Sequence, residues 1–223
     1  MAVNEVDLLA QIQASTEEGD RDQTVALTQQ ALDQGLEVTR ILDDGLIAAM
    51  DVIGDRFSKG EIYVPEMLIA AHAMKGAMEL LRPILTASGV ESRGLCIIGT
   101  VEGDLHDIGQ NLVHMMWEGA GFEVINLGTE TTAEEFIEAI NEHRPDIVGM
   151  SALLTTTMMH MPENIEAFKE ADVLGQVRVM VGGAPVTQEY ADEMGADAYG
   201  ADAASAVELA KRLVDAKRTS TPS

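Results

Sequence analysis

The feature that most constrains the fold is a repeated alternation, beginning near Ser88–Gly89, of short apolar runs with longer amphipathic stretches. The runs have the length and composition of buried parallel strands, and the stretches between them have the apolar spacing of helices. Strands separated by helices of this length favour a parallel sheet with right-handed crossovers. We therefore predict a doubly wound, Rossmann-like (flavodoxin-like) α/β domain over residues 89–217, with a five-stranded sheet.

The boundaries of the expected elements follow the pattern of apolar residues. The predicted strands are Leu95–Gly99, Glu123–Leu127, Ile147–Ser151, Val177–Val181 and Ala198–Tyr199. The predicted helices are Ile108–Gly119, Ala133–His143, Met158–Ala171, Thr187–Met194 and Ala203–Lys217. The polar residues 218–223 are expected to form a disordered tail.

Residues 1–88 show helical spacing instead, and we predict a four-helix bundle that forms a separate N-terminal cap domain. Pro65 suits the first turn of the last of these helices, where its missing N–H costs nothing. The four expected helices are Glu5–Ser15, Arg21–Gln34, Glu37–Phe57 and Pro65–Thr86.

Composition excludes several classes of protein. The 223 residues carry a formal net charge of −24, which opposes binding to nucleic acid or to an anionic membrane. We find no signal peptide and no apolar segment long enough to cross a membrane, so we expect a cytoplasmic protein. The one cysteine, Cys96, lies in a predicted strand and is expected to pack as a small hydrophobic residue. The 13 methionines are expected to fill the cores.

Polar or glycine-rich segments follow three of the predicted strands. Asp104 and His106 follow the first, a run of hydroxyl residues from Ser151 to Thr157 follows the third, and Gly182–Gly183 end the fourth. Ligands of open α/β sheets bind outside the carboxyl ends of the strands, so these segments are expected to line one crevice.

Other interpretations of these residues are open at this point. Glu102, Asp104 and Asp107 could form a solvated acidic loop or a carboxylate site for a hard divalent metal ion. A metal phosphohydrolase would need further histidines on helices, and the other four histidines lack such spacing. The threonines near Thr157 could serve only to cap a helix.

Three segments in order resemble the cobalamin-binding signature Asp-x-His-x-x-Gly, Ser-x-Leu and Gly-Gly. They are Gly103-Asp-Leu-His-Asp-Ile-Gly109, Ser151-Ala-Leu153 and Gly182-Gly183. With the helical cap before them, the chain resembles the corrinoid proteins of methylamine, methanol and betaine methyltransferase systems, and the cobalamin-binding module of methionine synthase. The resemblance implies cobalamin or a related corrinoid as cofactor, with methylcobalamin as its charged state.

The resemblance also implies roles for individual residues. His106 would displace the cofactor's own dimethylbenzimidazole and ligate cobalt, Asp104 would hold the other ring nitrogen, and Thr157 would complete this relay. Of the remaining residues, hydroxyls would contact the displaced nucleotide tail, glycines would leave room for it, and apolar cap residues would cover the reactive face of the corrin. The expected cofactor-binding residues are Gly103, Asp104, His106, Asp107, Ile108, Gly109, Ser151, Leu153, Thr155, Thr157, Gly182 and Gly183, with Phe57 and Val64 from the cap.

Two positions depart from the family's usual pattern. Gln110 stands where the family usually has lysine, and the relay hydroxyl belongs to a threonine, Thr157, where serine is more familiar. Neither departure removes a group that the implied site needs.

The resemblance implies a methyl carrier that has no catalytic residues of its own beyond the cofactor. No segment is large enough to form a substrate-binding barrel, so three partners are implied: a substrate-specific methyltransferase, an acceptor methyltransferase that uses a thiol or tetrahydrofolate, and a reductive activation protein. A cobalamin-dependent sensor is an alternative, and the small subunit of an adenosylcobalamin mutase is a third. The sequence does not indicate the methyl donor.

Overall fold

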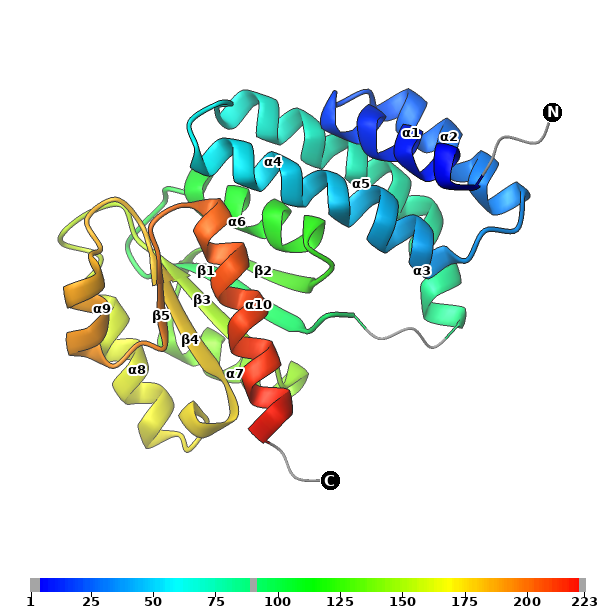
Figure 1. The fold of residues 1–223 in the computed structure, drawn as a ribbon. Coiled ribbons are helices and arrows are strands. Elements are labelled where there is room, and N and C mark those ends of the chain that lie inside the picture. Colours follow the sequence, from blue (N-terminus) through cyan, green and yellow to red (C-terminus); the bar gives the residue numbers. More distant parts are fainter. Residues whose placement is uncertain (1–4, 89–91, 221–223) are drawn as a thin grey trace. The chain divides into compact units, whose positions relative to one another are not determined.

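The alternating segments of the second half of the chain form a five-stranded, fully parallel sheet with the order β2-β1-β3-β4-β5 (Figure 1). This confirms the predicted fold class. The computed structural model describes residues 5–88 and 92–220. The strands are β1 (Leu95–Val101), β2 (Glu123–Thr131), β3 (Ile147–Ser151), β4 (Arg178–Gly182) and β5 (Ala198–Gly200).

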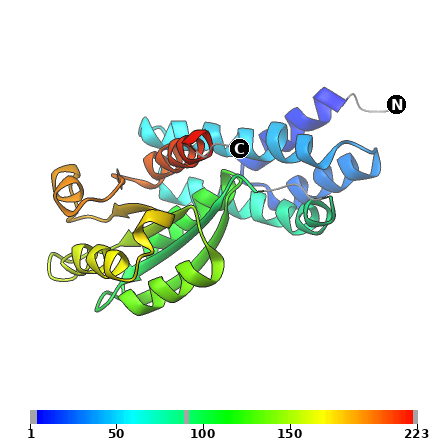
Figure 2. The ribbon, with the colours of Figure 1, turned by 90° about the horizontal axis from the view of Figure 1, so that it is seen from below.

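Helices cover both faces of the sheet (Figure 2). On one face, α6 and α10 lie side by side, and the indole N–H of Trp117 donates to the carbonyl of Ala206 over 3.2 Å. On the other face, α7, α8 and α9 enclose a core in which the rings of Phe136 and Phe168 meet edge to face at 6.0 Å. The helices are α6 (Ile108–Gly119), α7 (Ala133–His143), α8 (His160–Glu170), α9 (Gln188–Met194) and α10 (Ala203–Ser220), and a 3₁₀ turn, η2 (Leu174–Gln176), precedes β4.

The strand order determines where a ligand can enter this sheet. The chain leaves β1 to one side, toward β2, and then returns to place β3 on the other side of β1. Such a reversal opens a crevice between the carboxyl ends of β1 and β3. Ligands usually bind at this place in sheets of this topology. In register, Thr100 of β1 lies beside Ser151 of β3, and Ser151 lies beside Gly182 of β4.

The N-terminal half is helical, as predicted. Its core consists of fully buried aliphatic side chains that recur at helical spacing, including Leu8, Ile12, Leu46, Met67 and Leu81. The elements are α1 (Glu5–Glu17), α2 (Arg21–Asp33), α3 (Val38–Arg40), the π-helical turn η1 (Ile41–Ile47), α4 (Ala48–Ser58) and α5 (Val64–Ala87). No helix among the described residues has both the length and the low charge needed to span a membrane.

The third predicted helix, Glu37–Phe57, is wrong in one respect, because η1 interrupts it. Gly45 lies in this turn, and a Cβ atom there would come within 3.0 Å of Ile12 Cγ2, so close packing against α1 accompanies the wider turn. The described residues form two compact units. One consists of residues 5–88 and Ser92 with Gly119–Gly121, and the other of Arg93–Glu118 and residues 122–220.

Smaller differences occur at the ends of elements. Strands β1 and β2 continue beyond their predicted ends to Val101 and Thr131. Helix α10 continues to Ser220, so the part of the predicted tail that the structure describes is helical rather than disordered. The predicted domain boundary falls beside residues 89–91, and these, like 1–4 and 221–223, lie outside the described residues.

Candidate functional site

The loop between β1 and α6 folds around the buried carboxylate of Asp104. The turn begins with Gly103 at a φ of +74°, a left-handed conformation that suits glycine, and the N–H of Asp104 then donates to the carbonyl of Val101 over 3.1 Å. From β2, the N–H of Glu130 donates to the carbonyl of Asp104 over 3.1 Å. Asp104 is completely buried, whereas the residues on both sides of it are exposed.

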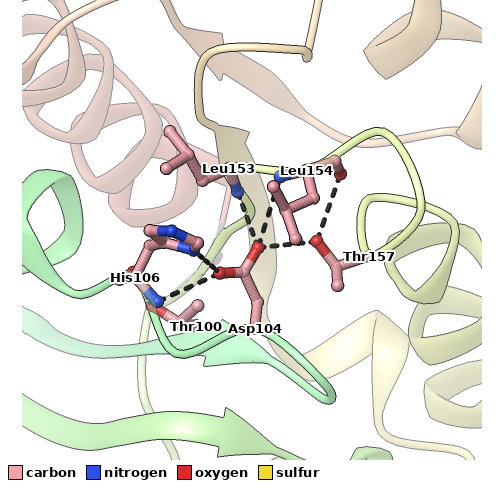
Figure 3. A network of polar contacts seen from close by, with 6 residues as sticks. All are labelled: Thr100, Asp104, His106, Leu153, Leu154 and Thr157. Atoms are coloured by element: carbon pink, nitrogen blue, oxygen red, sulfur yellow. Dashed lines mark hydrogen bonds and ion pairs between the residues drawn. The ribbon is translucent and has the colours of Figure 1, made fainter.

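Five donors surround the Asp104 carboxylate (Figure 3). On Oδ1, the main-chain N–H and the ring Nδ1 of His106 lie 3.0 and 2.7 Å away. On Oδ2, the N–H groups of Leu153 and Leu154 donate over 2.8 and 3.4 Å, and the hydroxyl of Thr157 donates over 2.6 Å. The carboxylate therefore joins the loop after β1 to the loop after β3, across the opening of the sheet.

These donors determine the charge of the carboxylate. Burial raises the pKa of Asp104, but the hydrogen bonds from Thr157, Leu153 and His106 lower it by more than burial raises it. The pKa of Asp104 therefore lies well below the ordinary carboxylate value. Asp104 is therefore ionised at neutral pH and acts only as an acceptor.

An ionised acceptor also determines the state of the neighbouring imidazole. Because Asp104 can only accept, the Nδ1 atom of His106 carries a proton in this contact, and in the neutral imidazole this leaves the lone pair on Nε2. The His106 side chain is 51% exposed, and within the described residues Nε2 makes no hydrogen bond. A ring oriented in this way by a carboxylate is the usual arrangement of a histidine that ligates a metal.

Large apolar side chains surround this exposed imidazole. Leu105 and Ile108, on either side of His106 in the sequence, are 68% and 78% exposed, and Leu153 and Leu154, whose N–H groups bind Asp104, are 43% and 42% exposed. Exposed apolar groups gathered around one polar group are typical of a binding surface for a large ligand. At Gly109, in the first turn of α6, a Cβ atom would meet nothing within 4 Å, so the chain itself does not require glycine there.

Close contacts within the protein explain why two glycines stand at the end of β4. Gly183 has a φ of +127°, and a Cβ atom there would lie 1.9 Å from the carbonyl oxygen of Ala152. At Gly182 a Cβ atom would lie 3.0 Å from the carbonyl oxygen of Gly200. The sequence suggested glycines that leave room for a ligand. The structure shows that Gly183 lets the loop after β3 approach the end of β4, and that Gly182 lies close to Gly200 at the end of β5.

The other predicted site residues are divided between the sheet domain and the helical unit. Ser151 ends β3, and the exposed Thr155 lies in the next loop; the hydroxyls of both make no hydrogen bond among the described residues. Phe57 and Val64, both partly exposed, belong to the helical unit, near the end of α4 and at the start of α5. Asp107 precedes α6, and its carbonyl accepts from the N–H of Asn111 over 2.7 Å.

The structure adds contacts that the sequence did not indicate. The buried hydroxyl of Thr100 donates to the carbonyl of His106 over 3.2 Å, and the buried Gln110 donates to Oδ1 of Asn126 over 2.5 Å. The main-chain donors of Leu153 and Leu154 cannot be recognised from the sequence, because almost every residue type has a main-chain N–H. Among the described residues, no three histidine, cysteine, aspartate or glutamate side chains are grouped to hold a metal ion, so the alternative site on Glu102, Asp104 and Asp107 is not formed.

Known protein families match both halves of the chain. Two B12 binding domain families match the chain, one over residues 94–208 and the other over residues 8–82. Trimethylamine corrinoid protein 2 of Methanosarcina acetivorans is 41% identical over 210 residues, which cover 93% of this chain and 97% of that protein. A corrinoid protein of Desulfitobacterium hafniense is 40% identical over 212 residues, which cover 94% and 98%.

A solved structure extends the comparison to three dimensions. The methanol:cobalamin methyltransferase complex of Methanosarcina barkeri contains a chain with a TM-score of 0.82 and 28% identity, and the match covers 93% of this chain and 80% of that one. The similarity includes both the helical half and the sheet domain. The chain therefore belongs to the family of corrinoid proteins that are built from two B12 binding domains and bind cobalamin or a related corrinoid.

Proposed function

We propose that this protein carries methyl groups between enzymes on a corrinoid bound with its own base displaced and His106 in its place. The names of the relatives support the methyl-transfer role, because one is a trimethylamine corrinoid protein and another is part of a methanol:cobalamin methyltransferase complex. The observation that supports the binding mode is the orientation of His106, whose Nδ1 is held by Asp104 while Nε2 has no partner among the described residues.

The residues around His106 fit a corrinoid in their chemistry. Neutral imidazole is a suitable ligand for a transition metal such as cobalt, and the exposed apolar side chains of Leu105, Ile108, Leu153 and Leu154 suit a wide, largely apolar macrocycle. Gly109 adds a position where nothing from the chain fills the space of a Cβ atom. When bound, the corrinoid supplies the cobalt that accepts and gives up the methyl group.

Asp104 and Thr157 keep the imidazole ready to bind. Because Asp104 remains ionised, it holds the proton on Nδ1 and directs the lone pair of Nε2 outward. Thr157 and the N–H groups of Leu153 and Leu154 in turn hold the carboxylate. The ring therefore cannot turn away without breaking a charged hydrogen bond.

The remaining predicted residues complete the proposed site. We assign the hydroxyls of Ser151 and Thr155 to the displaced nucleotide tail, and Phe57 and Val64 to the shielding of the reactive face from water. The residues that contact or admit the cofactor from the sheet domain are Gly103, Asp107, Ile108, Gly109, Leu153, Gly182 and Gly183.

The proposal requires three partner proteins. A substrate-specific methyltransferase delivers the methyl group from a methylated amine, betaine, methanol or an aryl ether, and a second methyltransferase passes it to a thiol or to tetrahydrofolate. A reductive activation protein restores the cofactor after accidental oxidation.

Isotope transfer tests the carrier function. The full chain, reconstituted with cobalamin and reduced, is incubated in an extract of the producing cells with carbon-13 methyl donors of the four classes. We expect one donor to load a labelled methyl group onto the protein, detected by mass spectrometry. The protein without cofactor is the control, and absence of label with every donor would contradict the carrier function.

A further inference from the structure

His106 is held at two separate places. Its main-chain N–H and its ring Nδ1 both contact a single atom, Oδ1 of Asp104, at 3.0 and 2.7 Å. Both of these contacts end on one acceptor atom, so the orientation of His106 relative to the sheet depends also on what holds its carbonyl. The carbonyl of His106 is held elsewhere, because it accepts from the hydroxyl of Thr100 over 3.2 Å.

Thr100 provides a rigid reference for this second contact. It is completely buried near the end of β1, and it pairs in register with Ser151 of β3, so its main chain belongs to the centre of the sheet. A β-branched side chain also has few rotamers available. In Figure 3, Thr100 lies beside His106 and apart from the donors around Oδ2 of Asp104.

We propose that Thr100 is a positioning residue that sets the direction of the His106 imidazole relative to the sheet, and so the strength with which Nε2 binds the cobalt of a corrinoid. The inference rests on the proposed role of His106 as axial ligand. The contact of the hydroxyl is with the main-chain carbonyl of His106, so it acts through the main chain of that residue.

The length of the contact sets the size of the effect. At 3.2 Å it is longer than the usual O–H···O hydrogen bond, so its loss leaves the Asp104 contacts and the fold in place. We expect the loss to weaken coordination by about fivefold rather than abolish it.

Three variants and one matched control isolate the hydroxyl. Thr100→Val keeps the shape and removes the donor, Thr100→Ala does the same with a smaller side chain, and Thr100→Ser keeps the donor. Thr131→Val is the control, because Thr131 is also a buried threonine near the carboxyl end of a strand, and its hydroxyl donates to a main-chain carbonyl, that of Gly128, over 3.4 Å.

The experiment follows the absorbance of the full chain reconstituted with methylcobalamin as acid is added, and records the pH at which the histidine ligand is released. We expect Thr100→Val to raise this midpoint by about 0.7 pH unit, which corresponds to fivefold weaker coordination. Thr100→Ala is expected to shift it in the same direction, and Thr100→Ser and Thr131→Val to stay within about twofold of the wild type.

Two results would overturn the inference: unchanged midpoints in both Thr100→Val and Thr100→Ala, or an equal shift in Thr131→Val. Failure of the proposed function would look different. In that case the wild-type protein itself would show no histidine-coordinated spectrum at any pH.

Discussion

Two aspartates tie β1 to β3 at opposite ends of the sheet, and they do so in opposite directions. Asp104 follows β1 and accepts from the N–H groups of Leu153 and Leu154 after β3. Asp146 precedes β3, and its Oδ2 accepts over 3.1 Å from the N–H of Leu95 at the start of β1. Each side chain therefore bridges the two central strands through main-chain donors.

The two carboxylates differ in burial and in their remaining partner. The side chain of Asp146 is 30% exposed, and its other oxygen accepts from the ammonium of Lys217 over 2.9 Å, so this cation balances its charge. Asp104 is completely buried, and its remaining partner is the ring of His106. In the proposed function, the Asp104 tie also serves the cofactor, because its last donor is an imidazole whose second nitrogen can bind a metal.

Removal of the two carboxylates should separate these cases most strongly. Asp104→Ala leaves five donors without their acceptor, and we expect it to lower the free energy of unfolding by about 3–5 kcal/mol. Asp146→Ala loses one main-chain contact and a surface ion pair, so we expect a loss of about 1–2 kcal/mol. Urea unfolding of the proteins without cofactor measures both; equal losses would show that burial does not distinguish the two ties.

Acid should weaken the Asp104 tie in a defined direction. The pKa of Asp104 is lower in the folded protein than its ordinary value of 3.8, so its ionised form stabilises the fold above that pH. We expect the wild type to exceed Asp104→Asn by about 2 kcal/mol at pH 7, and the difference to shrink as the pH falls below 3.8. Unfolding at a series of pH values checks this, and a difference that grows toward acid would contradict it.

The ion pair at the other end should matter less. Replacement of Lys217 by methionine removes the ammonium but keeps much of the apolar stem, and we expect a stability loss below about 1 kcal/mol that diminishes further in high salt. Cobalamin binding should not change, because Lys217 contacts Asp146 and the carbonyl of Gln176, both away from the carboxyl ends of the strands. Cofactor retention is measured by gel filtration. Weaker retention in Lys217→Met would contradict the proposal that only the Asp104 end of the sheet serves the cofactor.

The smallest expected effect concerns two residues with left-handed backbone, one near each tie. Glu130, which donates its N–H to Asp104, has a φ of 55°, and Arg144, two residues before Asp146, has a φ of 49°. Glycine adopts this conformation without strain, so Glu130→Gly and Arg144→Gly should each stabilise the fold by about 0.5 kcal/mol. Thermal unfolding measures both, and a destabilised Glu130→Gly would indicate that its side chain has a role of its own.

Much of the fold could be predicted because the apolar residues repeat with the period of the element that they form. Strands β1 and β2 were predicted too short because their last residues, such as Thr100 and Thr131, are polar, although the ladder of hydrogen bonds includes them. The π-helical turn at Gly45 accompanies close packing against Ile12, and periodicity does not report such a contact between residues distant in the sequence.

In the site, too, the sequence predicted some of the interacting residues and did not predict others. The resemblance to corrinoid proteins implied the association of Asp104, His106 and Thr157, and in the structure Asp104 contacts both of the other side chains. The N–H groups of Leu153 and Leu154 were not predicted as partners of Asp104, because main-chain donors are independent of residue type.

The most direct test of the account is the origin of the nitrogen bound to cobalt. The full chain is labelled with nitrogen-15 in its histidines only, reconstituted with unlabelled cobalamin, reduced to Co(II), and measured by electron paramagnetic resonance. If His106 is the axial ligand, each cobalt line splits into a doublet instead of the triplet given by nitrogen-14, and His106→Ala loses that splitting. A triplet that persists in the labelled protein would show that the cofactor's own base remains bound, and would contradict the account.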